Sequence, residues 1–146
     1  MLTLVLPFPP SVNHYWQHTR RGTFVGERGL VFRNAVSLIA MQHRARALFP
    51  LKDEQVAAVE LYPPTRAARD HDNWGKALWD ALAHAGVLAN DSLIREGAYR
   101  MCAPLAGGAC LVGLVPAHGP RQEWDPLIPL PHWCEGKKLA KVRKKP

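Results

Sequence analysis

One stretch in the middle of this chain repeats its apolar residues with the period of a helix, and no other feature restricts the possible folds as strongly. Apolar side chains recur three and four positions apart throughout residues 72–85, which predicts an amphipathic helix. The stripe consists of Trp74, Ala77, Leu78, Ala81, Leu82 and Ala85. Gly86 follows at once and is the residue type that ends helices. Because the stripe is apolar, the fold must supply a surface that covers it, and we expect a sheet.

The segments around this helix alternate between strand and helix patterns. A second helical pattern covers residues 27–48, and Pro50 stops it. Four segments have the length and apolar content of strands, namely 2–6, 55–62, 94–103 and 109–115. We expect the last two to form a hairpin across the sequence LAGG, and we expect residues 7–26 to form a long loop. The order β-α-β-α-β-β predicts a single α+β domain with one mixed sheet and two main helices.

The composition changes near the end of the predicted sheet. Residues 118–132 include four prolines, and residues 137–146 hold six lysines or arginines without an acid. We therefore divide the chain into a compact domain of residues 1–117 and an irregular, basic C-terminal extension of residues 118–146. The chain has a net charge of +7, and removing the six tail cations leaves +1. Such a tail attracts nucleic acid without reading its sequence, or it serves only for solubility.

The cysteines and the N-terminus indicate the compartment. Cys102, Cys110 and Cys134 are odd in number and form no CxxC pair, which suits a reducing cytoplasm. The first residues, MLTLVLPFPP, have no basic segment and are interrupted by prolines, so we interpret them as a strand and not as an export signal. No apolar run approaches the roughly 20 residues that cross a bilayer, so no membrane partner is expected.

Three aspartates and one lysine cluster around the central helix of an otherwise basic chain. Asp70 and Asp72 lead into the helix, Lys76 lies one turn after Asp72, and Asp91 follows five residues after Gly86. Carboxylates that share a cleft hold hard divalent cations such as Mg²⁺, which keep open positions for phosphate oxygens. A lysine beside them can stabilise an anion whose negative charge increases during a reaction. The joint pattern favours metal-dependent phosphodiester chemistry.

Each of these residues also has a purely structural interpretation. Asp72 is a suitable N-cap of the helix, and Asp70 complements the helix dipole. Lys76 can pair with Asp72 and with Asp80, each four residues away. The spacing does not establish whether the loop that carries Asp91 returns to the same cleft.

The loop between the first strand and the first helix mixes cations with aromatic rings. This composition suits phosphates and unpaired bases, so we expect Asn13, Tyr15, Trp16, Arg20 and Arg21 to contact DNA. The alternative is an ordinary surface loop in which Trp16 enters the core. Further predicted DNA contacts lie before Asp70 and in the tail, namely Arg66, Arg69, Lys137, Lys138, Lys141, Arg143, Lys144 and Lys145.

Three segments together resemble the RusA family of Holliday-junction resolvases, small phage and bacterial endonucleases that cut four-way DNA junctions. They are LPFPPSVNHYW near the N-terminus, RDHDNWGKALWDALAHAG at residues 69–86 and NDS at residues 90–92. The resemblance covers residues 1–117 and includes the order of the elements.

This resemblance implies an activity and an assembly. Asp70, Asp72 and Asp91 would bind Mg²⁺, with Mn²⁺ as a substitute, and Lys76 would complete the catalytic set. The implied product has a 5′ phosphate and a 3′ hydroxyl, and the implied setting is DNA recombination and repair in the cytoplasm of a bacterium, encoded by the host or by a phage. A homodimer with one active site per subunit would make paired symmetric nicks in branched DNA. Trp79 is predicted to pack against the second subunit, to stack on a base or to lie under the first loop.

Two other functions fit the same residues. A general structure-specific nuclease that acts on flaps or other branched DNA shares the chemistry and differs in its substrate. A catalytically inert DNA-binding protein would use its acids only to cap a helix. The acid set argues against the inert protein, because carboxylates repel phosphate unless a cation lies between them.

Overall fold

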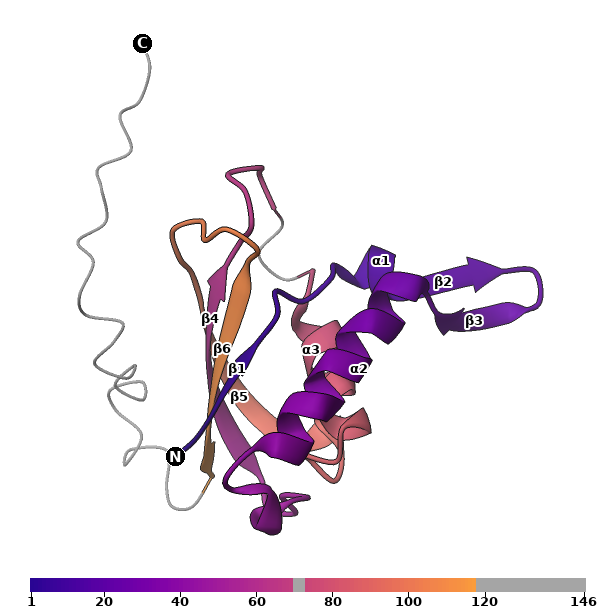
Figure 1. Cartoon of the computed structure of the whole chain (residues 1–146). Helices are drawn as coiled ribbons and strands as arrows, with labels where there is room; N and C mark the ends of the chain where they lie inside the picture. The colour runs from indigo at the N-terminus through magenta and orange to yellow at the C-terminus, as the bar shows by residue number, and fades with distance from the viewer. Residues whose placement is uncertain (70–72, 118–146) are drawn as a thin grey trace.

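Four strands form a mixed sheet in the order β1-β6-β4-β5. The computed structural model describes residues 1–69 and 73–117. The strands are β1 (Leu2–Leu6), β4 (Gln55–Tyr62), β5 (Ile94–Met101) and β6 (Ala109–Pro116). β6 pairs antiparallel with β1 and with β4, whereas β4 pairs parallel with β5. This arrangement confirms the predicted α+β fold with a mixed sheet, and the main helices lie on one face of that sheet (Figure 1).

The predicted hairpin between the last two strands is wrong. β4 lies between β5 and β6, so these two strands do not pair. β4 is buried along almost its whole length, and a mostly apolar strand of this kind takes an inner position. β5 is largely exposed and carries Arg95, Glu96 and Arg100, and charged residues suit an edge strand. The difference in burial between the strands therefore decides their order.

Two helices pack against each other on one side of the sheet (Figure 1). α2 (Glu27–Gln42) ends before the predicted boundary at residue 48, because His43 is extended and its Nε2 lies 3.0 Å from the Thr3 carbonyl oxygen of β1. A separate 3-10 turn, η1 (Arg46–Leu48), follows.

The central helix α3 (Gly75–His84) begins later than predicted. Its N-cap position is Trp74, so the interpretation of Asp72 as the N-cap is wrong. Gly86 has a φ of +72°, which a glycine adopts without strain, and the helix ends just before it as predicted.

The core lies between the sheet and these two helices. Alternate strand residues, including Leu4, Val59 and Val112, face the helices and are buried. The stripe of α3 meets them, and its members Ala77, Leu78, Ala81 and Leu82 are fully buried. Burial of each of these leucine side chains stabilises the fold by about 1.5–3 kcal/mol. The stripe thus positions the polar face of α3 at the surface, where Lys76 lies.

The predicted first loop contains regular structure. α1 (Val12–Tyr15) leads into a hairpin of β2 (Trp16–Thr19) and β3 (Gly22–Val25), which projects away from the sheet in Figure 1. Gly22 has a φ of +129° directly after the turn, a conformation that favours glycine. The hairpin forms a second, two-stranded sheet.

Two expectations about the chain as a whole can be compared with this fold. None of the helices within the described ranges combines the length and the apolar character that a membrane crossing requires. Cys110 is buried in the core and Cys102 is only partly buried, both with free thiols, and Cys134 lies outside the described residues.

Candidate functional site

Lys76 lies between two aspartates at the start of α3. Its Nζ is 3.5 Å from Asp80 Oδ1, one turn further along the helix, and 3.7 Å from Asp91 Oδ2 in the 3-10 turn η2 (Asp91–Leu93). The side chains of Lys76 and Asp91 are 61% and 39% exposed, so both reach solvent. The structure therefore brings two of the four predicted catalytic residues together, and the loop that carries Asp91 does return to the helix.

The loop after α3 is anchored so that Asp91 meets Lys76. Val87 and Leu88 are buried in the core and hold the loop against the domain. The Asn90 side chain then accepts a hydrogen bond from the backbone N–H two residues later, at 2.9 Å, and caps η2. These contacts position Asp91 through its backbone and leave its carboxylate on the solvent side.

Asp80 is a member of this cluster that the sequence analysis treated only as a surface partner of Lys76. Its side chain is 15% exposed, and its Oδ2 is buried without a hydrogen-bond partner among the described residues. Burial raises the pKa of Asp80, Lys76 opposes this effect, and Asp91 adds to it. A buried carboxylate with one unsatisfied oxygen is costly, and such groups gather at functional sites. The available sequence signal is its position four residues after Lys76, on the same helix face.

The predicted metal ligands Asp70 and Asp72 lie outside the described residues, but both flanks of their segment are anchored. Arg69 donates from Nη1 to two carbonyl oxygens of its own loop, each at 2.9 Å. On the other side, the Asn73 carbonyl oxygen accepts a hydrogen bond from the backbone N–H of Val12 in α1. Asn73 therefore lies beside α1 just before the start of α3, the end of the helix that carries Lys76.

Carboxylate oxygens are the donors that hard divalent cations prefer, and Asp80 and Asp91 supply two such groups here. Within residues 1–69 and 73–117, no group of three or more His, Cys, Asp or Glu side chains is arranged to hold a metal ion. The chemistry of these donors fits a hard divalent cation such as Mg²⁺.

The rings of Tyr15 and Trp16 are turned into the protein. Tyr15 is fully buried and its hydroxyl accepts a hydrogen bond from Arg33 Nε at 2.6 Å, so this ring is not placed to stack on DNA. Trp16 is partly buried and packs edge-on against Tyr15, with 5.3 Å between the ring centroids. Arg33 also lies over both rings. The structure thus corrects the prediction for Tyr15 and favours the alternative in which Trp16 packs inward.

The other predicted DNA-contact residues of the described ranges are at the surface. Asn13 is exposed on α1, and Arg20 and Arg21 form the exposed turn of the β2–β3 hairpin. Thr19 Oγ1 accepts a hydrogen bond from the backbone N–H of Arg21 at 3.2 Å, which braces this turn. Arg66 is exposed in the loop after β4. The six predicted contacts in the tail lie outside the described residues: Lys137, Lys138, Lys141, Arg143, Lys144 and Lys145.

Trp79 packs against a residue of its own chain that was not predicted. The three predicted positions were against a second subunit, on a DNA base and under the first loop. Its ring lies 6.3 Å from that of Tyr99 on β5, between centroids. Trp74 packs edge-on against the same Tyr99 at 4.8 Å. Burial raises the pKa of Tyr99, so the phenol stays neutral. This aromatic group connects α3 to the edge of the sheet.

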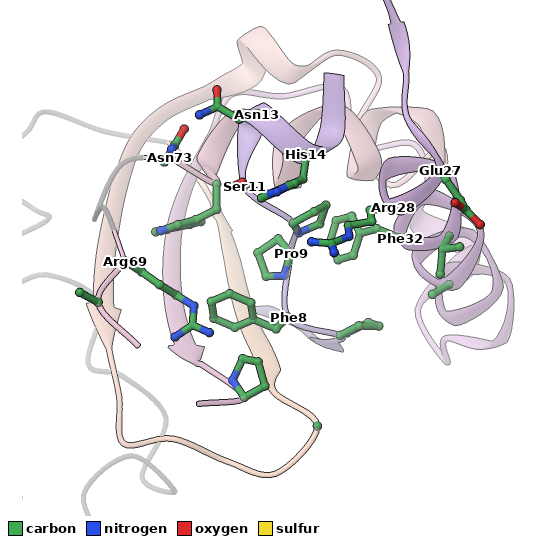
Figure 2. A pocket seen from close by; sticks show the side chains of 18 residues that line it. Phe8, Pro9, Ser11, Asn13, His14, Glu27, Arg28, Phe32, Arg69 and Asn73 are labelled. Atoms are coloured by element: carbon green, nitrogen blue, oxygen red, sulfur yellow. Dashed lines mark hydrogen bonds between the residues drawn. The ribbon is translucent and has the colours of Figure 1, made fainter. Parts of the chain in front are cut away.

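A cavity of about 910 Å³ has Arg69 and Asn73 among its lining residues. Its wall comes from the proline-rich loop after β1, from the first turns of α2 and from residues on both flanks of residues 70–72. Figure 2 shows the labelled lining residues Phe8, Pro9, Ser11, Asn13, His14, Glu27, Arg28, Phe32, Arg69 and Asn73. The wall is thus largely apolar, and its polar groups are two arginines, two amides, Ser11, His14 and the carboxylate of Glu27.

Comparison with known proteins finds one family model and several relatives, all with the same name. The family model described as "Endodeoxyribonuclease RusA" matches residues 7–104. The chain is 38% identical over 95 residues to the crossover junction endodeoxyribonuclease RusA of Escherichia coli O139:H28 (strain E24377A / ETEC), which covers 63% of this chain and 75% of that protein. The protein of the same name from Escherichia coli strain K12 is 37% identical over 95 residues, with the same coverage of 63% and 75%. The crossover junction endodeoxyribonuclease RusA of Enterobacteria phage 82 is 35% identical over 94 residues, which are 62% of this chain and 74% of that protein.

Proposed function

This chain belongs to the RusA family of endodeoxyribonucleases, and from this premise we propose that it resolves four-way DNA junctions by paired, metal-dependent nicks. The observation that carries the proposal is the position of Lys76, 3.7 Å from Asp91, within the matched residues 7–104. We assign the activity to DNA recombination and repair in the cytoplasm. The inert DNA-binding alternative loses its main support, because the N-cap position of α3 is Trp74 and not Asp72.

We assign Asp70, Asp72 and Asp91 as the ligands of Mg²⁺, with Mn²⁺ as a substitute. A divalent cation there would make an acidic cleft attractive to phosphate and would supply Lewis acidity toward the phosphoryl oxygens. The protein's own contribution is position, because the buried residues before Asp91 and the cap of η2 hold its carboxylate at the surface. Hydrolysis would leave a 5′ phosphate and a 3′ hydroxyl.

Lys76 supplies positive charge next to this acidic cleft. Its long side chain is mostly exposed, so Nζ can approach a phosphate at the position of Asp91. Negative charge on the phosphoryl oxygens increases toward the transition state, and a fixed ammonium group lowers the energy of that state more than that of the substrate. The role requires that Lys76 be held in place before DNA arrives.

We infer that Asp80 is a positioning residue for Lys76. It contacts the ammonium group from the protein side at 3.5 Å, and Asp91 contacts it from the solvent side. Because Asp80 is largely buried, it does not reach the DNA itself and acts on the reaction through Lys76.

Replacing Asp80 with asparagine is expected to lower the cleavage rate about tenfold, because a neutral amide holds an ammonium group less strongly than a carboxylate does. Asparagine has nearly the same volume, so the melting temperature and the junction affinity should change little. The matched control is Asp53→Asn, which removes the same charge from an exposed aspartate that does not pair with Lys76. A cleavage rate equal to that of Asp53→Asn would exclude the positioning role.

We propose that DNA contacts extend from this site over the exposed cations. Arg20 and Arg21 are at the tip of the projecting hairpin, where they can reach phosphates away from the cut (Figure 1). Asn13 and Arg69 line the same cavity as Asn73, and Arg66 lies in the loop that leads to Arg69. The tail lysines and arginines add affinity for any DNA shape, because their contribution depends on phosphate charge alone.

We propose that the protein acts as a homodimer, with the second copy on the sheet face opposite the helices. On that face Leu111 and Val115 of β6 are apolar and partly exposed, whereas Val56 and Ala58 of β4 are already buried within the chain. Val5 on the neighbouring strand β1 is 64% exposed, and no helix of the described residues covers this face (Figure 1). An apolar sheet face of this kind favours burial against another surface.

The proposal is tested by incubating the purified protein with a labelled four-way junction, a flap and a linear duplex, each with and without Mg²⁺. We expect paired symmetric nicks in the junction only when Mg²⁺ is present, and nicks that a ligase reseals without further processing. Equal cleavage of flap and junction would support the general structure-specific nuclease instead. Binding without cleavage of any substrate would support the inert DNA-binding protein.

A further inference from the structure

We propose that the cavity between Phe8, Arg28 and Arg69 receives one unstacked nucleotide of the DNA strand that is cut. The inference rests on the proposed function, because it assumes that a DNA strand passes the start of α3. It adds a binding site for a nucleobase to the acidic cluster, and none of the catalytic roles assigned above requires that site.

The position of the cavity is the first argument. Arg69 and Asn73 line it, and these residues flank the segment that carries Asp70 and Asp72. Asn73 is also tied to α1 through the backbone N–H of Val12. A strand that presents a phosphate to the acidic cluster therefore passes the mouth of the cavity within the neighbouring nucleotides.

The chemistry of the wall is the second argument. Phe8 and the prolines beside it form an apolar surface on which a flat base can stack. Arg69 lies over the Phe8 ring, 5.5 Å from its centroid, and is held there by hydrogen bonds to its own loop. Figure 2 shows this pair on one wall, with Arg28 and Phe32 on another. The wall thus combines an apolar surface for a base with two arginines for a phosphate, and these outnumber its one carboxylate, that of Glu27.

Two features make Arg28 the most informative residue of the cavity. It is exposed in the first turn of α2, and it has no ion-pair or hydrogen-bond partner within residues 1–69 and 73–117. A cation that is left unpaired at the mouth of a cavity is available for an anionic ligand. The amides of Asn13 and Asn73, at one end of the cavity in Figure 2, can bond to the edge of a base.

The size of the cavity is consistent with this ligand. Its volume of about 910 Å³ lies in the range of about 300–1,000 Å³ that is usual for pockets that bind small molecules. Extruding a base from a junction is less costly than extruding it from a duplex, because base pairing at the branch point is already disturbed.

The test uses four-way junctions that carry the fluorescent base 2-aminopurine at single positions on either side of the cut. Fluorescence of this base increases when it leaves the stack, and EDTA keeps the strands intact during the measurement. We expect wild-type protein to increase the fluorescence severalfold at one flanking position and not at the others. Arg28→Ala and Phe8→Leu should remove most of this increase, while Arg44→Ala, an exposed arginine outside the cavity, should not.

The outcomes separate this inference from the proposed function. A protein that cuts the junction with Mg²⁺ but leaves every flanking base stacked would overturn the nucleotide site and leave the nuclease proposal intact. An increase that persists in both Arg28→Ala and Phe8→Leu would also overturn it, because the unstacked base would then lie elsewhere. If the fluorescence increase is lost in the cavity variants but the wild-type protein never cuts DNA, the nucleotide site would be supported and the proposed function would be contradicted. Because Arg28 is exposed, its variant tests the site even if Phe8→Leu fails to fold.

Discussion

Replacing Asp91 with asparagine is expected to reduce junction cleavage about a thousandfold or more, the scale of loss that follows removal of a central catalytic group. Asparagine preserves the size of the side chain and removes its charge, which weakens both metal binding and the contact with Lys76. The same result is expected for Asp70→Asn and Asp72→Asn. Junction binding should be retained or become tighter, because each substitution removes repulsion between a carboxylate and phosphate.

The measurement is a single-turnover cleavage assay over a range of Mg²⁺ concentrations, together with a gel-shift assay of binding. Asp53→Asn again serves as the control, since it also removes one negative charge but does so at an aspartate that does not pair with Lys76. Cleavage by Asp91→Asn at the wild-type rate would show that this aspartate is not catalytic. A large loss of thermal stability would instead assign Asp91 to the structure of η2.

Segments with a clear hydrophobic period were predicted well from the sequence. The predicted strand at 55–62 matches β4 residue by residue, because its apolar run is bounded by polar residues and by two prolines. The apolar stripe of α3 and its end before Gly86 were also predicted. Both cases depend on local information, namely the spacing of apolar side chains and the residue types that end an element.

Features that depend on contacts between distant segments were not predicted. The pairing of β5 with β4 and not with β6 reflects relative burial, which is a property of the whole sheet. The early end of α2 depends on a contact between His43 and the carbonyl oxygen of Thr3 on β1. The β2–β3 hairpin was missed because its strands have only four residues each, although Gly22 after the Arg20–Arg21 turn is a signal for one.

In the candidate site, too, the sequence predicted some features and missed those that depend on distant contacts. Lys76 was identified from its place in a motif, but its contact with Asp91 required the folded loop. Asp80 was visible in the sequence only as one of several residues four positions from a charge. The role that we propose for it rests on its burial, and burial of a single polar residue on an amphipathic helix is not apparent from spacing alone.

A heterodimer with one wild-type subunit and one Asp91→Asn subunit is expected to nick a junction on one strand and to resolve it rarely. The reason is geometric, because resolution without a gap needs two cuts related by the two-fold symmetry of the junction, and a dimer supplies two active sites with that symmetry. Two different affinity tags on the subunits allow the mixed dimer to be isolated. On a supercoiled plasmid with a cruciform, a single nick yields an open circle and paired nicks yield a linear product.

The same plasmid assay distinguishes a dimer from a monomer that cuts twice. Val5 is exposed on the sheet face that we assign to the second copy, so Val5→Lys should give a monomer by sedimentation, and its product should change from linear to open circular. The substitution lies on the opposite side of the sheet from Lys76, so the single nick itself should persist. Linear product from a protein that sediments as a monomer, or from the isolated mixed dimer at the wild-type rate, would contradict the dimer. In either case one functional active site would make both cuts, and symmetry between subunits would not be the source of paired cleavage.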